Sequence, residues 1–225
     1  MENVDELLPN AKIESNIPVG VGLGSSASLS CALARSFPQS NAFELAKRFD
    51  DHFHQGSSGI DVFTILYGGL CSLSPERGFE RLPDLFLDYL NEFSFSIINT
   101  GVERSVASIK SKLLPEQIKE YAQQIRPVSE SFFNHLQSNV LTLPVLISLF
   151  NEANRYLICL GVSTPLLNDL FDRIIRSGLL IGAKITGGGG GGCVLLVHDR
   201  SLPKASLDSF VPAGGILYFN IKFKR

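Results

Sequence analysis

Apolar residues recur along this chain at two spacings, one typical of helices and the other typical of strands. Residues 41–54 show the helical spacing, and Asn41 stands where an N-cap residue is expected. The segment "SASLSCALARSF" has the small and apolar residues of a closely packed helix, and Pro38 ends it. The inner side of the predicted helix 41–54 is formed by Phe43, Leu45, Ala46 and Phe49.

Short apolar runs predict strands in the rest of the chain, at "AKIES", "FSFSIINTG", "GAKIT", "CVLLVH" and "GILYFNIKF". "IDVFTILYGGLCSL" predicts a buried helical or extended segment that ends in a Gly-Gly turn and a strand. Residues 104–178 are mainly helical in pattern, and "LPKASLDSF" predicts another helix. Because strands and helices mix without strict alternation, the sequence predicts an α+β fold. The prolines expected at helix starts or breaks are Pro115, Pro127, Pro144 and Pro165.

Composition and charge narrow the class of protein. The chain has 225 residues, of which 44% are hydrophobic and 19% charged, values typical of a globular protein. A net charge of −2 argues against bulk attraction to nucleic acid or to a membrane surface. The first ten residues lack the features of a secretory signal, and no apolar stretch is long enough for a membrane span. Four scattered cysteines without a CxxC motif fit reduced thiols in a cytoplasmic protein.

The stretch "GVGLGSS" at residues 20–26 is the first candidate for chemistry. Gly20, Gly22 and Gly24 alternate immediately before a predicted helix, whose first N–H groups and positive dipole end suit a phosphate. Ser25 and Ser26 add hydroxyl groups that can contact phosphate oxygens or Mg²⁺. The alternative is a tight turn with Ser25 as an ordinary N-cap. The spacing matches neither the Walker nor the complete dinucleotide-binding pattern.

Several motifs together resemble a known family. "PVGVGLGSSAS" resembles the second motif of the GHMP kinases, P-x-x-x-G-L-G-S-S-A. "SSGID", "YGG", "INTGVERS" and "KITGGGGGGC" resemble stretches of the mevalonate kinases in that family, in the same order. The resemblance covers about residues 11–200. It implies a truncated N-terminal domain like ribosomal protein S5 over residues 1–90, and a ferredoxin-like α+β domain over residues 91–225.

The resemblance also implies roles for particular residues. Ser15 matches a serine that contacts the nucleotide. The phosphates of ATP would be held by the loop residues Gly20, Val21, Gly22, Leu23, Gly24, Ser25 and Ser26. Asp61 matches the proposed catalytic base, whereas from its position alone it reads as a helix N-cap. Mg²⁺ would be bound by Ser26 and by Asp50, which stands where the family has a glutamate. Asp50 then acts directly or through water, Asp51 compensates for it, or metal binding is weakened; a solvated helix face is the remaining alternative.

The six consecutive glycines, Gly187 to Gly192, are either a linker or a wall of the site. The strands predicted on both sides favour the wall, because such a loop lets backbone approach backbone or substrate. In the family this loop packs against the phosphate loop. Arg104 matches a family arginine that meets a phosphate or an acidic substrate, and a surface position is the alternative. The residues assigned to the wall are Gly187, Gly188, Gly189 and Gly190, with Gly188 in place of the usual alanine.

The sequence contains no match to the lysine-bearing first motif of the family, "PGK…GEH". Three alternatives follow: the product is truncated and inactive, another chain or a homodimer partner supplies the missing half, or the fold serves a different binding role. The resemblance nevertheless implies an ATP- and Mg²⁺-dependent enzyme that phosphorylates the primary hydroxyl of mevalonate. A kinase for phosphomevalonate or another small alcohol is the near alternative. A non-catalytic phosphate-ligand binding module is the alternative from another class.

Overall fold

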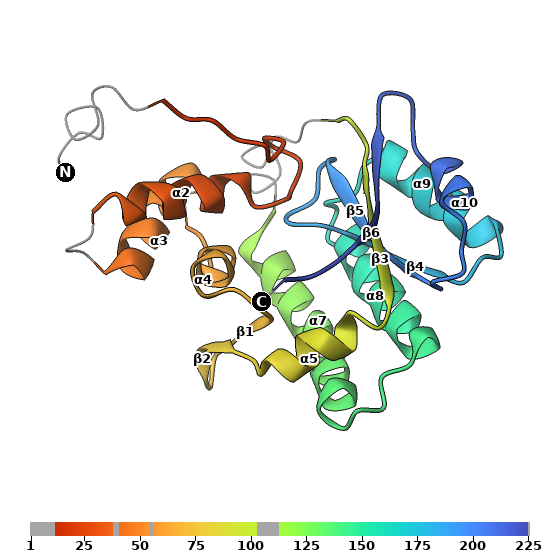
Figure 1. The fold of residues 1–225 in the computed structure, drawn as a ribbon, viewed down its shortest axis with the longest axis horizontal. Helices are drawn as coiled ribbons and strands as arrows, with labels where there is room; N and C mark the ends of the chain where they lie inside the picture. The colour runs from red at the N-terminus through yellow and green to blue at the C-terminus, as the bar shows by residue number, and fades with distance from the viewer. Residues whose placement is uncertain (1–11, 38–40, 55, 103–112, 225) are drawn as a thin grey trace.

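The computed structural model describes residues 12–37, 41–54, 56–102 and 113–224, and its elements form an α+β fold, as predicted (Figure 1). The helices are α2 (Ser25–Arg35), α3 (Ala42–His54), α4 (Ile60–Tyr67), α5 (Asp84–Leu90), α7 (Pro115–Gln137), α8 (Leu143–Cys159), α9 (Pro165–Arg176) and α10 (Lys204–Asp208). The strands are β1 (Cys71–Ser74), β2 (Gly78–Arg81), β3 (Ser94–Asn99), β4 (Ile181–Ile185), β5 (Cys193–His198) and β6 (Ile216–Ile221). No helix in these ranges combines the length and apolar character needed to cross a membrane.

Helices α2, α3 and α4 form a group of their own, at the left of Figure 1. Their shared core contains the small buried side chains Ala27, Cys31, Ala34, Ala46 and Val62. Small residues on α2 let the two other helices approach closely, as the sequence predicted. The Asn41 side chain accepts hydrogen bonds from the N–H groups of Phe43 and Glu44, at 3.1 and 3.3 Å, which confirms it as the N-cap of α3.

The larger part of the chain is built on a four-stranded antiparallel sheet of order β4-β5-β3-β6. In chain order these strands are the second, third, first and fourth of a ferredoxin-like β-α-β-β-α-β unit. Side chains on β5 alternate between two apolar clusters. Val194 and Leu196 pack with α9 and α10, whereas Val197 packs with α5, α7 and the start of α8. The expected boundary at residue 90 stays a prediction.

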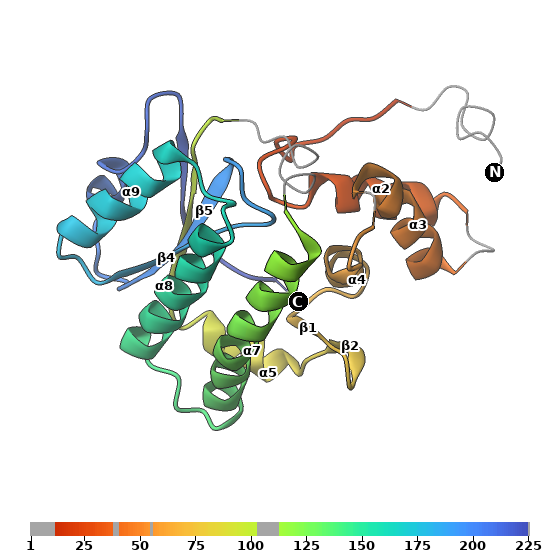
Figure 2. The same ribbon diagram turned by 180° about the vertical axis from the view of Figure 1, so that it is seen from behind.

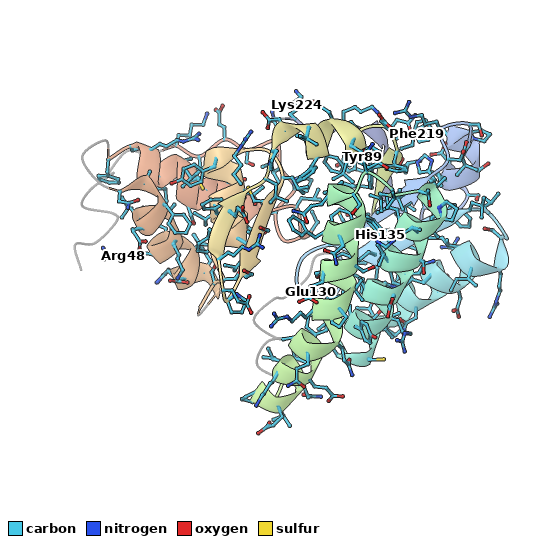
Figure 3. All side chains as sticks on the ribbon, turned by 90° about the horizontal axis from the view of Figure 1, so that it is seen from below. Arg48, Tyr89, Glu130, His135, Phe219 and Lys224 are labelled. Atoms are coloured by element: carbon cyan, nitrogen blue, oxygen red, sulfur yellow. The ribbon has the colours of Figure 1, made fainter. Side chains whose placement is uncertain are left out.

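Helices α7 and α8 lie side by side beside the sheet (Figure 2). Tyr89 of α5, labelled in Figure 3, donates a hydrogen bond of 2.7 Å to the Leu141 carbonyl just before α8. This bond ties the connection between α7 and α8 to the segment that leads into β3.

Three features of the fold differ from the sequence-based predictions. Residues 12–15 form no strand: Ile13 is 62% exposed, and the described strands include none that pairs with this segment. A strand needs a neighbour for its backbone groups, which a local pattern cannot guarantee. Pro127 lies inside α7 rather than at a break, because Val128 and Leu136 are buried on the same helix and hold it together. Strand β2 and helix α5 were not predicted.

The edge strand β4 is closed by side chains rather than by another strand. Asn151 and Asn154 of α8 accept hydrogen bonds from the N–H groups of Ala183 and Ile185, at 3.0 and 3.1 Å. Exposed N–H groups on an edge strand invite pairing with other chains. Helix α8 therefore satisfies this edge with its two amide oxygens.

A buried histidine joins three strands of the sheet. His198 on β5 is 1% exposed, and its Nε2 lies 2.9 Å from the Ser96 hydroxyl on β3. The Ser96 oxygen accepts a 3.1 Å hydrogen bond from the Asn220 N–H on β6, and Phe219 stacks on the imidazole. Because Nδ1 lies 2.9 Å from the Asp199 carbonyl, it carries the proton, and Nε2 accepts from Ser96. This arrangement suits a neutral imidazole.

The free energy of unfolding is expected to fall as the pH drops below about 6.5, the ordinary pKa of histidine. Burial lowers the pKa of His198, so the unfolded chain binds a proton at a pH where the folded chain does not. The contribution of His198 to the free energy of unfolding is complete above the pKa of the unfolded chain. It is lost as the pH falls through the pKa of the folded chain. Urea unfolding between pH 5 and 8 measures it. In His198→Asn the free energy of unfolding should depend less steeply on pH. An unchanged pH dependence in that variant would contradict the role given to His198.

Candidate active site

The glycine-rich loop at residues 20–24 has the backbone that a phosphate loop requires. Gly20, Gly22 and Gly24 have φ of 75°, 84° and 75°, a left-handed conformation that residues with a Cβ rarely adopt. Gly24 is the N-cap of the 11-residue helix α2, so no side chain caps the first turn. The N–H groups of that turn and the positive end of the helix dipole meet at one place, which favours an anion.

The loop of six glycines docks on the phosphate loop through backbone atoms. The Cys193 N–H donates a 2.9 Å hydrogen bond to the Val21 carbonyl. A Cβ at Gly192 would lie 2.3 Å from that same carbonyl oxygen. Only a glycine allows such an approach. The prediction that this loop packs against the phosphate loop is therefore confirmed, and the linker alternative is wrong.

Further contacts fix the second half of the loop of six glycines. The Gly190 N–H donates to the Val162 carbonyl at 2.6 Å, and the Gly192 N–H donates to the Val102 carbonyl at 3.0 Å. The Gly192 carbonyl accepts two bonds from Thr100, one from its N–H at 2.9 Å and one from its hydroxyl at 2.8 Å. The loop thus joins the phosphate loop, the end of β3 and the connection between α8 and α9.

Thr100 is a positioning residue that the sequence analysis did not single out. Its side chain is 1% exposed, and its hydroxyl acts through Gly192 rather than on a ligand. The available signal was its place in "INTG", directly after an apolar strand and before a glycine. A buried threonine at the end of a strand has a hydroxyl that must bond to nearby backbone.

Asp61 lies in the first turn of α4, whose N-cap is Gly59. The N-cap alternative for Asp61 is therefore wrong. Ile65 is the residue of α4 nearest to Gly24, since a Cβ at Gly24 would lie 3.9 Å from its Cδ1. Residues four apart share one side of a helix. Asp61 accordingly lies on the same side of α4 as Ile65, one turn nearer the N-terminus, and it is exposed to solvent.

The loop before α4 is held by contacts from α3 and β2. The Asp51 carboxylate accepts a 2.7 Å hydrogen bond from the Ser57 N–H and pairs with Lys47 at 3.0 Å. Gly59 is buried, and a Cβ there would lie 3.3 Å from both the Lys47 Cδ and the Phe79 Cζ. The loop cannot shift far, so the start of α4 and Asp61 are fixed. One Asp51 oxygen holds this loop, and the other pairs with Lys47 on the same helix.

Asp50 is 2% exposed on the face of α3 that packs against α2. Burial raises the pKa of the Cys31 thiol on α2 to about 11, and the nearby Asp50 charge adds to this rise while Arg35 opposes it. Within the described residues no group of three or more His, Cys, Asp or Glu side chains forms a metal cluster. Mg²⁺ commonly needs only one or two carboxylates beside phosphate oxygens and water. The oxygen donors of Ser26 and Asp50 fit that requirement in kind.

The remaining predicted residues have different surroundings. Ser15 is exposed, and its hydroxyl lies 3.1 Å from the Ile17 N–H, from which it accepts a hydrogen bond. Gly187 and Gly188 are exposed at the tip of their loop, whereas Gly189 is buried beside Val162. Arg104 lies outside the described residues. The roles given to these residues stay predictions.

Replacing Asp51 by alanine is expected to lower the free energy of unfolding by about 1–2 kcal/mol, because the Ser57 N–H loses its partly buried acceptor. Urea unfolding measures the loss. Asp169→Ala is the matched control, since Asp169 pairs with Arg173 four residues later at 3.0 Å and is exposed. The control should cost no more than about 0.5 kcal/mol. Equal losses in the two variants would show that the contact with Ser57 contributes nothing.

Comparison with known proteins agrees with this geometry. The sequence profile "GHMP kinases N terminal domain" matches residues 3–69, and "GHMP kinases C terminal" matches residues 144–210. The mevalonate kinase of Archaeoglobus fulgidus is 32% identical over 211 residues, which cover 88% of this chain and 69% of that protein. The chain belongs to the GHMP kinase family. The fold and the family predicted from the motifs are confirmed.

Other members of the GHMP kinase family are also similar to this chain over more than half of their length. The mevalonate kinase of Pyrococcus furiosus is 35% identical over 196 residues, and this chain spans 57% of its length. The crystal structure of the Methanococcus jannaschii mevalonate kinase superposes with a TM-score of 0.73 at 22% identity, over 94% of this chain and 67% of that one. This structural likeness concerns the fold. The family consists of phosphotransferases that generally use ATP and Mg²⁺.

Proposed function

We propose that this GHMP kinase transfers the γ-phosphoryl group of ATP to the primary hydroxyl of mevalonate. Relatives named mevalonate kinase, with identities of 32% and 35%, support the choice of substrate. The observation that carries the proposal is the phosphate loop itself. Its glycine backbone leads into an uncapped helix N-terminus, and the contact between Cys193 and Val21 holds it in place.

The groups of this chain would act mainly by positioning the phosphates and the substrate hydroxyl. The N–H groups of residues 20–26 would bind phosphate oxygens at the start of α2. Asp61 would accept a hydrogen bond from the substrate hydroxyl and take its proton as the new bond forms. Positioning and electrostatics dominate phosphoryl transfer, so the fixed start of α4 matters as much as the basicity of Asp61.

Ser26 and Asp50 would hold Mg²⁺, since both offer the oxygen ligands that this ion prefers. When bound, the ion neutralises charge on the phosphate oxygens. Asp50 is already buried on the side of α3 that packs against α2, so its carboxylate lies beside the helix that carries Ser26. This buried position near Cys31 of α2 favours Asp50 over Asp51 as the ligand.

Two measurements on the full chain test the proposal. Calorimetric titration with ATP, with and without Mg²⁺, should give binding that strengthens with the metal. A coupled assay of ADP release should then respond to mevalonate more strongly than to phosphomevalonate or homoserine. Absence of binding up to millimolar ATP would refute the proposal for this chain. A stronger response to phosphomevalonate or homoserine would move the substrate to another small alcohol.

The second candidate is a phosphate-ligand binding module without turnover. The observation in its favour is Asp50, whose side chain is one methylene shorter than the glutamate of the family pattern. Mg²⁺ demands near-ideal octahedral geometry, so a shorter ligand can leave binding intact and turnover poor. ATP binding with no ADP release from any of the three alcohols would select this candidate.

A further inference from the structure

Residues of α8, α9 and the edge strand β4, all three labelled in Figure 2, line a cavity of about 380 Å³. None of the phosphate-loop residues lines it. The volume falls at the lower end of the range of small-molecule sites. The surface of its wall is mainly apolar, and polar side chains from both helices reach it at a few points.

Three asparagines on this wall have their oxygen atoms already engaged. The Asn151 and Asn154 oxygens accept from the N–H groups of Ala183 and Ile185, at 3.0 and 3.1 Å. The Asn168 oxygen accepts from the Ser163 hydroxyl at 2.6 Å. What remains at each amide is its NH₂ group, which can only donate. Within the described chain none of these NH₂ groups donates a hydrogen bond, and Asn154 is only 5% exposed.

One positive charge stands on the same wall. The Arg155 guanidinium lies 4.7 Å from the centre of the Tyr156 ring, and no carboxylate in the described ranges pairs with it. Asp172 is the single carboxylate of the wall, and its nearest cation is Arg176, at 3.9 Å. Three amide donors and a guanidinium therefore face one acceptor, a balance that suits a ligand rich in acceptor atoms.

The rest of the wall is apolar. Phe171 and Ile174 are buried at its base, whereas Ile158 and Ile175 are 36% and 73% exposed at its mouth. Exposed isoleucines at the mouth of a cavity can cover the hydrocarbon body of a ligand whose polar head lies further in. A purely polar ion would leave this part of the wall without a partner.

We propose that the cavity binds a small amphipathic anion, with a carboxylate or phosphate head and a short hydrocarbon body. The head would accept hydrogen bonds from Arg155 and the asparagine NH₂ groups, and the body would cover the two isoleucines. Asp172 repels an anion, so it sets the head toward Arg155 on α8. The proposal does not rest on the kinase reaction, because it concerns different residues and needs no ATP.

Hexanoate is the probe, with hexylamine and hexanol as comparators of nearly the same size. Calorimetric titration of the full chain should give a dissociation constant for hexanoate at least about tenfold below that of either comparator. Hexyl phosphate distinguishes the two sources of the anion, and the tighter of the two identifies the head group. Equal binding of hexanoate and hexylamine would overturn the proposal. So would the absence of hexanoate binding at concentrations up to about 10 mM.

Two surface substitutions test the charge assignment with opposite signs. Arg155→Gln should weaken hexanoate binding about tenfold, whereas Asp172→Asn should strengthen it a few-fold. Both side chains are exposed enough that the fold should survive, which circular dichroism checks. Arg126→Gln on α7 is the matched control, because Arg126 is exposed and lies outside the cavity. Unchanged affinity in Arg155→Gln, or equal losses in Arg155→Gln and Arg126→Gln, would refute the assignment.

Discussion

Asp61→Asn is expected to lower the rate of ADP release about 10²- to 10⁴-fold while ATP affinity stays within about twofold. The amide keeps the size of the side chain but cannot take the proton of the acceptor hydroxyl. Because Asp61 is exposed and Gly59 rather than Asp61 caps α4, the helix should keep its structure. Steady-state assays with saturating mevalonate and calorimetric ATP titration measure the two quantities separately.

Glu44→Gln is the matched control for this prediction. Glu44 is an exposed carboxylate in the first turn of α3, so it has the same relation to its helix as Asp61 has to α4. Its replacement should change stability by less than about 1 kcal/mol and leave the rate unchanged. If Asp61→Asn retains more than a tenth of the rate, the carboxylate is not the proton acceptor.

A second large effect is expected from Gly192→Ala, with a loss of about 3 kcal/mol in the free energy of unfolding. The added Cβ would lie 2.3 Å from the Val21 carbonyl oxygen, a backbone atom that cannot rotate away. The two loops would have to separate, and the hydrogen bond from Cys193 to Val21 would lengthen or break. ATP affinity should therefore fall more than about tenfold, since the phosphate loop loses its support.

Gly214→Ala separates the clash from the cost of the backbone conformation. Gly214 has φ +79° and Gly192 has φ +81°, but a Cβ at Gly214 meets no atom within 4 Å. Its replacement should cost about 1–2 kcal/mol from the left-handed backbone alone and leave ATP affinity unchanged. If Gly192→Ala behaves like Gly214→Ala in both urea unfolding and ATP titration, the docking of the two loops has no energetic importance.

Local patterns predicted those parts of the fold whose causes are local. The helix α3 follows from its apolar spacing and from Asn41, whose side chain caps the first turn. The strands on both sides of the six glycines follow in the same way. The strand expected at residues 12–15 fails because its stability depends on a neighbour, and none of the described strands provides one. Helix α5 starts after Pro83 and has only 7 residues, too few for a clear period.

In the candidate site, too, features with local causes were predicted and features that depend on distant residues were not. The motif around residues 20–26 identified the loop, and the glycine φ values explain why its spacing is so particular. Which of Asp50 and Asp51 faces α2 was open in the sequence, because adjacent residues on a helix point about 100° apart and either can be buried. Thr100 escaped notice because its role depends on Gly192, a residue 92 positions away in the chain.

The docking of the two loops is made by main-chain atoms, the Val21 carbonyl and the Cys193 N–H. The contact therefore depends on the backbone at these two positions and not on the identity of their buried side chains, whereas position 192 tolerates no Cβ. A sequence alignment should show more than one kind of small apolar residue at 21 and 193 beside a fixed glycine at 192. Evolution would then be free to reshape the surroundings of the phosphate loop while its position in space is inherited unchanged.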